Sequence, residues 1–414
     1  MKNNFVGFGL GAIQGGLFLL EAAKSGNFER LTVAEVMPDM VAALREGDGY
    51  FHVNVATAKG INRDKVGPVL ACNPRIPADR QRLVEAVAEA DEIATALPSV
   101  QFYGDGEPGS VVDILAEGLK LRVAAGSRRA SVVYTAENHN HAAGILEEKL
   151  NRHLGDQAEI LPGRMQFLNT VIGKMSGVVV DEQQMREQKL ARLVGDTGRC
   201  LLVEAFNRIL ISRITLPGFR RGIEVFTEKA DLLPFEEAKL YGHNATHALL
   251  GYLARLRGLR FMADIRNHAG LQQLGRDAFI EESGAALCRR HAGIDRLFTP
   301  AGYREYVDDL LERMMNPALR DAVERVVRDP RRKLGWDDRL IGTMRVALDA
   351  GINPERYALG AAAALRMLED EEGGAAGMSL LDGLWSEAGA RASETERLRV
   401  MLVDASKKLR NFVK

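Results

Sequence analysis

The order of two hydrophobic patterns constrains the fold of this chain most. In the first half, short apolar runs typical of strands alternate with amphipathic stretches typical of helices. Strands are expected at residues 4–9, 30–36, 92–97 and 131–135, and helices at residues 15–25, 39–46 and 111–119. Such alternation is typical of a parallel sheet with helices on both faces, so the sequence predicts an N-terminal α/β domain.

After about Phe235 the pattern changes to long helices with almost no β-branched runs. These helices are expected at residues 236–257, 276–292, 302–315, 317–328, 337–350 and 354–369. A chain of 414 residues is also too long for one ordinary core. We expect a Rossmann-type dinucleotide-binding domain over residues 1–198 and a mainly α-helical substrate and catalytic domain over residues 199–414. The placement of residues 154–232 stays open, although the strand-like run 200–211 would suit the sheet.

Charge and cysteine usage exclude several classes of protein. Lysine and arginine number 55 against 56 aspartate and glutamate, so the net charge of −1 offers no basic field for nucleic acid or an anionic membrane. Three widely spaced cysteines exclude a disulfide framework and a CxxC zinc module. Residues 3–20 are uncharged, but their glycines make a poor signal peptide, and no other run could span a membrane. We expect a soluble, cytoplasmic monomer or dimer.

The first expected strand ends in a glycine-rich turn that leads into the first expected helix. Glycines at positions 9 and 11 match the first two glycines of a GxGxxG motif, and Gln14 stands at the third. In a dinucleotide fold these glycines let the pyrophosphate approach the backbone and the helix N-terminus. An acid that ends the next strand would bind the ribose hydroxyls of NAD and repel the extra phosphate of NADP.

We therefore predict an NAD site in this part of the chain. The predicted cofactor-binding residues are Gly9, Gly11, Ala12, Ile13 and Glu35. The alternative is an ordinary strand-to-helix turn with a capping acid, because glycines also mark such turns.

Polar side chains share one arc at the start of the helix expected over residues 236–257. On an α-helix, His243, Asn244 and His247 fall on the same side as Lys239. A lysine desolvated in a cleft has its pKa drawn toward neutrality and can take a proton from an alcohol. Asn244 can donate to the oxygen that becomes a carbonyl, and His247 can orient a neighbouring hydroxyl. The alternatives are a solvated helix start and a zinc site on the two histidines, which no suitably spaced acid completes.

This pattern resembles the polyol-specific long-chain dehydrogenases, the mannitol dehydrogenase family. Lys239, Asn244 and His247 match the family signature of a lysine, four residues, an asparagine, two residues and a histidine. Further similarity lies at residues 279–285, 316–317, 321–328, 332–334 and 338–341, and upstream at the glycine turn, Glu35 and Glu137-Asn138. The similarity covers most of the chain and is strongest over residues 237–368.

The resemblance implies a zinc-independent hydride transfer between a secondary alcohol and NAD. It also implies a Rossmann domain and a helical domain with the active site between them. Lys239 would be the general base, Asn138 and Asn244 would polarise the forming carbonyl, and His247 would bind substrate.

Within the family, the runs Arg332-Lys333-Leu334 and Asp338-Arg339-Leu340 are more similar to the mannitol-1-phosphate branch than to the free-mannitol branch. A phosphorylated substrate needs fixed cations, and guanidinium groups bind phosphate with paired hydrogen bonds. The candidate phosphate ligands are Arg328, Arg331, Arg332, Lys333 and Arg339. The predicted reaction interconverts mannitol 1-phosphate and fructose 6-phosphate, and the alternative for each cation is a solvated basic helix face.

The chain also departs from the family. Relatives usually carry an Asp-Arg pair where Gly173-Lys174 stands here. Loss of that acid removes a hydroxyl contact, which leaves open an unphosphorylated polyol or hexuronate as substrate, or a catalytically idle homologue that binds dinucleotide. The polar run His139-Asn140-His141 is expected to cap the helix that starts near Ala142, or else to bind substrate hydroxyls.

Overall fold

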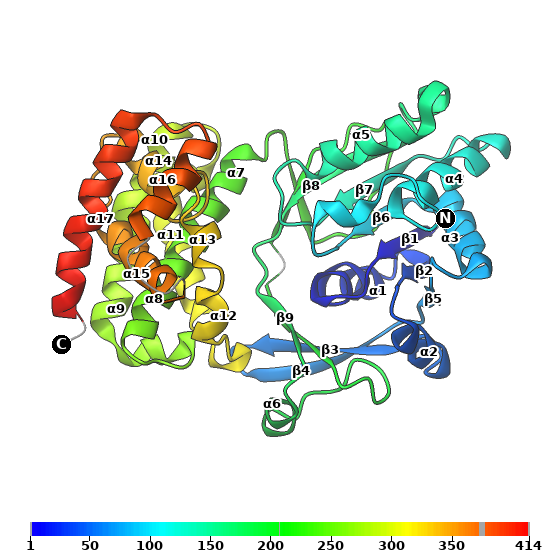
Figure 1. The fold of residues 1–414 in the computed structure, drawn as a ribbon. Helices are drawn as coiled ribbons and strands as arrows, with labels where there is room; N and C mark the ends of the chain where they lie inside the picture. Colours follow the sequence, from blue (N-terminus) through cyan, green and yellow to red (C-terminus); the bar gives the residue numbers. More distant parts are fainter. Residues whose placement is uncertain (1, 207, 372–376, 413–414) are drawn as a thin grey trace. The chain divides into compact units, whose positions relative to one another are not determined.

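Strand β1 (Asn3–Phe8) lies inside the main sheet, and five of its six residues are buried. The computed structural model describes residues 2–206, 208–371 and 377–412. They form two compact units, which divide between Leu232 and Leu233 (Figure 1). The expected architecture, an N-terminal α/β region with a mainly parallel sheet and an all-helical C-terminal region, is confirmed.

The main sheet has eight strands in the order β12-β11-β8-β7-β6-β1-β2-β5. Besides β1, these are β2 (Phe28–Ala34), β5 (Leu70–Cys72), β6 (Glu92–Thr95), β7 (Ser131–Thr135), β8 (Met165–Val171), β11 (Ile209–Ser212) and β12 (Phe226–Lys229). All neighbouring strands are parallel except β8 and β11. The register pairs Phe8 with both Ala34 and Thr95, so the residues that follow β1, β2 and β6 meet at one edge. That edge is where ligands bind in open parallel sheets.

Helices cover both faces of this sheet. The helical segments are η1 (Gln14–Leu19), α1 (Leu20–Ser25), α2 (Pro38–Glu46), α3 (Pro77–Glu89), η2 (Val100–Tyr103), α4 (Val111–Ala124), α5 (Ala142–Leu154), η3 (Gly155–Ile160) and α6 (Glu182–Glu187). Helices α3, α4 and α5 lie along one face and η1 with α1 lies on the other (Figure 1). Each face buries its own apolar core, as expected for strands covered on both sides.

A second, four-stranded sheet corrects the expected domain boundary. Its order is β4-β3-β10-β9, with β3 (Phe51–Thr57), β4 (Gly60–Val66), β9 (Ser176–Val179) and β10 (Cys200–Glu204). The expected strand over 200–211 is therefore two strands, since β10 pairs with β3 here and β11 joins the main sheet. Because β10, β11 and β12 all pair within the N-terminal unit, the boundary lies at 232/233 and not at 198/199.

The C-terminal unit contains helical segments of several lengths. They are α7 (Leu233–Glu237), η4 (Ala238–Asn244), α8 (Ala245–Leu256), η5 (Met262–Asn267), α9 (Ala269–Asp277), η6 (Ala278–Gly284), α10 (Ala285–Arg290), η7 (Arg296–Phe298), α11 (Pro300–Met314), η8 (Pro317–Leu319), α12 (Val323–Val327), α13 (Pro330–Lys333), α14 (Ile341–Asp349), α15 (Glu355–Glu371), α16 (Gly377–Glu387) and α17 (Ala392–Phe412). Helix α8 is buried along most of its length, and α17 packs along α15. Within the described part of the chain, no helix combines the length and apolar character that crossing a bilayer requires.

One expected helix is interrupted. The helix expected over residues 317–328 is replaced by η8 and the short α12. Arg320 adopts a left-handed conformation (φ 45°), and Ala322 then forms a β-bridge with Phe261. This break turns the residue between them, Asp321, away from a helical path.

Gln14, at the place of the third motif glycine, packs against Gly7 of β1. The Gln14 side chain is fully buried, and a Cβ built at Gly7 would lie only 2.0 Å from its Nε2. A glycine on the strand therefore makes the room that a glycine on the helix would otherwise provide. The helix and the strand therefore still pack closely, although the glycine lies on the strand and the larger residue on the helix.

This packing makes Gly7 intolerant of a side chain. We predict that Gly7→Ala lowers the free energy of unfolding by about 1–3 kcal/mol, measured by urea denaturation, because the added methyl group overpacks the interface. Adding Gln14→Ala should recover part of the loss, since it removes the clashing amide. Gly11→Ala is the control, because a Cβ at Gly11 meets nothing within 4 Å. Equal destabilisation by the two glycine substitutions would contradict this account.

Candidate functional site

The turn after β1 requires glycine at position 9 and leaves open space at position 11. Gly9 has a positive φ of 82°, and a Cβ there would crowd the carbonyl oxygen of Ala96 at 3.3 Å. At Gly11, which precedes the first helix, an added Cβ would have no neighbour within 4 Å. A ligand can therefore approach the backbone at the N-terminus of this helix, where unpaired N–H groups favour an anion.

Glu35 follows β2 and holds this turn in place. Its side chain is buried, and its two carboxylate oxygens accept hydrogen bonds from the backbone N–H groups of Leu10 and Met37, each at 2.9 Å. Glu35 therefore does cap this turn, as the alternative interpretation of the glycine motif expected. It does not exclude a ligand, because each carboxylate oxygen can accept a further hydrogen bond.

A pocket of about 440 Å³ opens over the turn. All five predicted cofactor residues line it: Gly9, Gly11, Ala12, Ile13 and Glu35. Its walls include Met40, Leu97 and Leu201, and Arg199 lines it as a cation that the sequence did not single out. Open backbone for a pyrophosphate, an acid for a ribose diol and apolar walls for flat rings fit the chemistry of a dinucleotide.

Asn138 follows β7 in the same unit and is exposed. The preceding Glu137 is buried and accepts hydrogen bonds from Thr95 Oγ1 and the Leu97 backbone N–H, each at 2.9 Å, and from the Tyr103 hydroxyl. Burial raises the pKa of Glu137 despite these bonds. Glu137 therefore ties the step before Asn138 to the loop after β6, while the carbonyl-polarising role of Asn138 stays a prediction.

Two other sequence features of this unit have structural roles. Lys174, at the departure from the family pattern, is buried and its Nζ donates to the carbonyl oxygen of Phe206 at 3.0 Å. The side chain of the N-cap residue His141 makes no capping bond, but Nδ1 of His139 accepts a hydrogen bond from the His141 backbone N–H at 3.1 Å. The backbone N–H of Ala143 donates to Oδ1 of Asn169 at 2.9 Å, so the run and β8 both contribute to the start of α5.

In the C-terminal unit, the predicted catalytic residues lie on one continuous helix with a π-helical segment. Segment η4 links α7 to α8 and includes Lys239 and Asn244. A π-helix closes its hydrogen bonds between residues five apart, so two residues with this spacing lie above one another on one face. On the α-helical period Asn244 lies at the far end of the arc that starts at Lys239, and the π-segment narrows the angle between them.

Lys239 has the environment of a lowered pKa. Burial, reinforced by the positive charge of Arg339, lowers the pKa of Lys239 to about 8. The same helix carries His243, whose burial holds its pKa well below the usual range, with His247 and nearby cations acting in the same direction. At neutral pH His243 is therefore uncharged, and a sizeable fraction of Lys239 can lose its proton a little above neutrality.

Asn244 and His247 line a strongly cationic pocket of about 450 Å³. The cations that line it are Arg325, Arg328, Arg332, Lys333 and Arg339, against one acid, Asp329. Three of the four predicted arginines and Lys333 are thus brought together with Asn244 and His247. Arg331 does not line the pocket, and Arg325 was not singled out from the sequence.

Lys333 is the most enclosed of these cations. Its side chain is buried, and burial together with Arg339 and Arg332 lowers the pKa of Lys333 to about 8. Arg332 is paired with Asp329 at 3.0 Å, and Arg339 with Asp338 at 2.8 Å. Crowded cations of this kind are stabilised by an anionic ligand.

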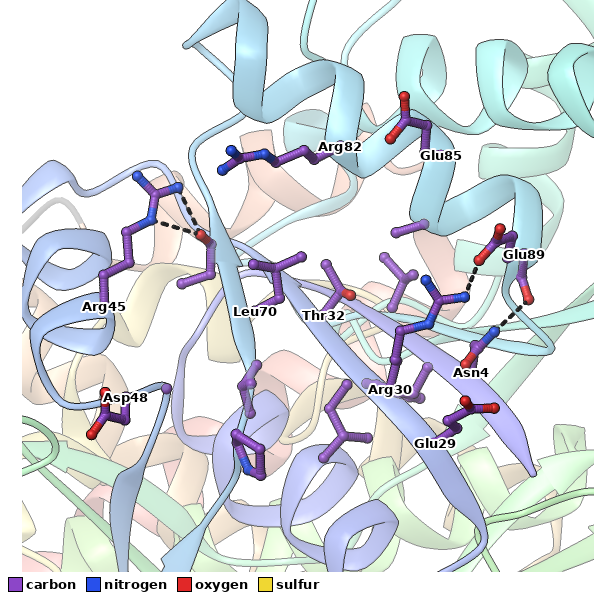
Figure 2. Close-up of a pocket in the computed structure, with 18 residues that line it drawn as sticks. Asn4, Glu29, Arg30, Thr32, Arg45, Asp48, Leu70, Arg82, Glu85 and Glu89 are labelled. Atoms are coloured by element: carbon purple, nitrogen blue, oxygen red, sulfur yellow. Dashed lines mark hydrogen bonds and ion pairs between the residues drawn. The ribbon is translucent and has the colours of Figure 1, made fainter.

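A wider hollow of about 660 Å³ lies elsewhere in the N-terminal unit, over β1, β2 and β5 (Figure 2). The arginines that line it are already paired with acids. Arg45 donates to the carbonyl oxygen of Ala71 at 2.9 Å and to Asp79 at 2.7 Å, and Arg30 pairs with Glu89. No predicted site residue lines it, so it is not assigned to the chemistry.

The zinc alternative has no supporting cluster. Nowhere in residues 2–206, 208–371 and 377–412 do three His, Cys, Asp or Glu side chains gather as a metal site requires. His247 is instead in contact with Asp321, at 2.9 Å between Nε2 and Oδ2.

Comparison with known proteins covers both units. Residues 3–213 match the mannitol dehydrogenase Rossmann domain and residues 231–410 match the mannitol dehydrogenase C-terminal domain. Mannitol-1-phosphate 5-dehydrogenase of Exiguobacterium sibiricum is 30% identical over 364 residues (87% of this chain, 84% of that protein), and that of Bacillus licheniformis 29% over 359 residues (87% and 86%). The solved ternary complex of Pseudomonas fluorescens mannitol 2-dehydrogenase with NAD and D-mannitol shares the fold, with a TM-score of 0.68 and 18% identity over 100% of this chain and 93% of that one.

The environment of Lys239 can be tested without any substrate. We predict that Lys239 titrates near pH 8, measured by NMR of ¹³C-methylated lysines and assigned with Lys239→Met. Arg339→Gln should raise this pKa because it removes a neighbouring positive charge, whereas Arg331→Gln should leave it unchanged. Titration of Lys239 with the exposed lysines above pH 10 would contradict the geometry.

Proposed function

The chain belongs to the mannitol dehydrogenase family of oxidoreductases, and we propose that it is an NAD-dependent dehydrogenase that interconverts mannitol 1-phosphate and fructose 6-phosphate. One observation carries this proposal. The pocket that Asn244 and His247 line also holds five cationic side chains, which suits a polyol whose one end is a phosphate.

The C-terminal unit supplies the acid–base chemistry. Neutral Lys239 takes the proton of the secondary alcohol as it is oxidised, and the same ammonium group returns the proton when the ketose is reduced. A pKa of about 8 suits both directions near neutral pH. Asn244, whose amide makes no hydrogen bond to another described side chain, donates to the oxygen that becomes the carbonyl. We assign Asn138 to the same polarising role.

The N-terminal unit binds the cofactor through the turn after β1. The backbone at Gly9, Gly11, Ala12 and Ile13 would hold the pyrophosphate, and Glu35 the adenosine ribose. When bound, NAD supplies the hydride acceptor for the alcohol. Glu35 favours NAD over NADP because its carboxylate would repel a 2′-phosphate.

The number of cations that line the pocket favours a phosphorylated substrate over the other candidates. An unphosphorylated polyol would bring no negative charge to a pocket lined by five cations and one acid, which is costly for the enclosed Lys333. The two mannitol-1-phosphate 5-dehydrogenases that match 87% of this chain support the same choice. A hexuronate, which carries one carboxylate, is the second candidate because the pocket would also attract that anion.

The substrate is tested by NADH oxidation with fructose 6-phosphate, beside fructose, tagaturonate and fructuronate. We expect turnover with the phosphate ester and little with the others. Arg332→Gln should raise KM for fructose 6-phosphate by about 10- to 100-fold through loss of a charged hydrogen bond. Arg331→Gln is the matched control, since the adjacent arginine does not line the pocket.

Other outcomes would reassign the activity. Turnover of fructose or a uronate in preference to the ester would overturn the phosphate assignment and leave Lys239 as the base. Bound NADH without turnover of any of the four would indicate an idle homologue. Loss of turnover in Lys239→Ala with NADH binding intact would exclude the idle homologue.

Cofactor choice is tested at Glu35. We predict that Glu35→Gln lowers the ratio of kcat/KM for NADH to that for NADPH by at least about 10-fold, because one repelling charge is removed. Glu29→Gln serves as the control, since Glu29 is an exposed acid of β2 outside the cofactor pocket. An unchanged ratio in Glu35→Gln would show that Glu35 acts only as a cap for the turn.

A further inference from the structure

Arg199 immediately precedes strand β10, and the chain around it fixes its backbone. The backbone carbonyl of Arg199 accepts a hydrogen bond from the N–H of Leu193 at 2.7 Å, which closes the loop of residues 193–199. The carbonyl of Leu193 in turn accepts a hydrogen bond from the N–H of His52 on β3 at 2.8 Å. Arg199 is therefore presented from a loop that is tied to the second sheet.

The guanidinium of Arg199 lies at the end of the cofactor pocket where Glu35 is found. Nη1 of Arg199 is 2.9 Å from Sδ of Met37, and the backbone N–H of Met37 donates to Glu35 at 2.9 Å. All three residues line the pocket, in which Arg199 is the one cation and Glu35 the one acid among the described residues. Because Glu35 is the residue assigned to the adenosine ribose, the guanidinium lies at the adenosine end of the pocket.

The charge of Arg199 has no acidic partner in the part of the chain that the structure describes. The contact of its side chain is with the thioether of Met37, which is a weak hydrogen-bond acceptor. A guanidinium carries five N–H donors in a planar fork that fits the oxygens of a phosphate. The other N–H groups of Arg199 can therefore bind an anion without breaking an ion pair.

The acids near this end of the pocket oppose an anion only in part. Both oxygens of Glu35 already accept backbone N–H groups, which offset some of its negative charge. Asp39, in the first turn of α2, is exposed and does not line the pocket. The side chain of Met37 makes no capping bond at the N-terminus of α2, so this helix end also favours negative charge.

We propose that Arg199 determines cofactor specificity by binding the 2′-phosphate of NADP, so that the protein accepts NADP(H) as well as NAD(H). This inference rests on the dinucleotide site of the proposed function and adds a second cofactor to it. The 2′-phosphate is the group by which the two cofactors differ, and it is carried by the ribose assigned to Glu35. Glu35 disfavours this phosphate and Arg199 favours it, so NADPH is used with a lower kcat/KM than NADH but is not excluded.

The first test measures binding and needs no ketose. Isothermal titration calorimetry gives the Kd of the whole chain for NADH and for NADPH. Arg199→Gln should weaken NADPH binding by about 10-fold or more, through loss of a charged hydrogen bond, and should leave NADH binding within about twofold. Retained NADH binding also shows that the variant is folded.

Two further variants control this measurement. Arg199→Lys keeps the positive charge but not the planar fork, so it should weaken NADPH binding less than Arg199→Gln does. Arg192→Gln is the matched control, because Arg192 pairs with Glu182 at 3.0 Å and does not line the pocket. It should leave both dissociation constants unchanged.

The second test measures cofactor use with fructose 6-phosphate. The ratio of kcat/KM for NADH to that for NADPH should rise by about 10-fold in Arg199→Gln, opposite in direction to the change expected for Glu35→Gln. An unchanged ratio in Arg199→Gln would overturn the inference.

The binding test also distinguishes failure of this inference from failure of the proposed function. Equal weakening of NADH and NADPH by Arg199→Gln would overturn the inference, because the guanidinium would then bind a group that both cofactors share. Wild-type protein that binds NADH but not NADPH would overturn it and leave the proposed function intact. Binding of neither cofactor would overturn both. Selective loss of NADPH binding supports the inference even where no ketose is turned over, and in that case only the proposed substrate is wrong.

Discussion

Crowded positive charge in a partly enclosed pocket determines the chemistry that the C-terminal unit can perform. Burial, reinforced by the positive charge of Arg339, lowers the pKa of both Lys239 and Lys333 to about 8. Burial and crowded charge together thus create an amine that can lose its proton and a pocket that attracts an anion. The phosphorylated polyol that we propose as substrate would suit both features, because its phosphate would neutralise the cations while its alcohol would present a proton to Lys239.

The N-terminal unit meets its own constraint by close packing around glycines. Gly9 adopts a backbone conformation that other residues rarely reach, Gly11 leaves the helix start open, and Gly7 makes room for Gln14. Glu35 then fastens the turn through two backbone N–H groups while it lines the same pocket. The features that stabilise this turn are therefore those that would shape it for a dinucleotide.

Features that depend on neighbouring residues were predicted from the sequence better than features that depend on contacts between distant residues. The alternation of strands and helices and the glycine turn depend on neighbouring residues, so they could be inferred from the sequence. The pairing of β10 with the distant β3 could not, and the domain boundary was misplaced for that reason. The π-segment around Lys239 carries no local signal that overrides an α-helical period, so the smaller angle between Lys239 and Asn244 could not be predicted. The contact of Asp321 with His247 was not expected, because the helix expected there is broken at Arg320.

The central claim is that Lys239 and the cationic pocket of the C-terminal unit act on one substrate, Lys239 in proton transfer and the pocket in phosphate binding. A crystal structure of the protein with NAD and mannitol 1-phosphate tests it most directly. The account predicts a secondary hydroxyl about 3 Å from Nζ of Lys239, with the phosphate in contact with Arg332 and Lys333. A phosphate bound outside this pocket, or a substrate hydroxyl out of reach of Lys239, would contradict it.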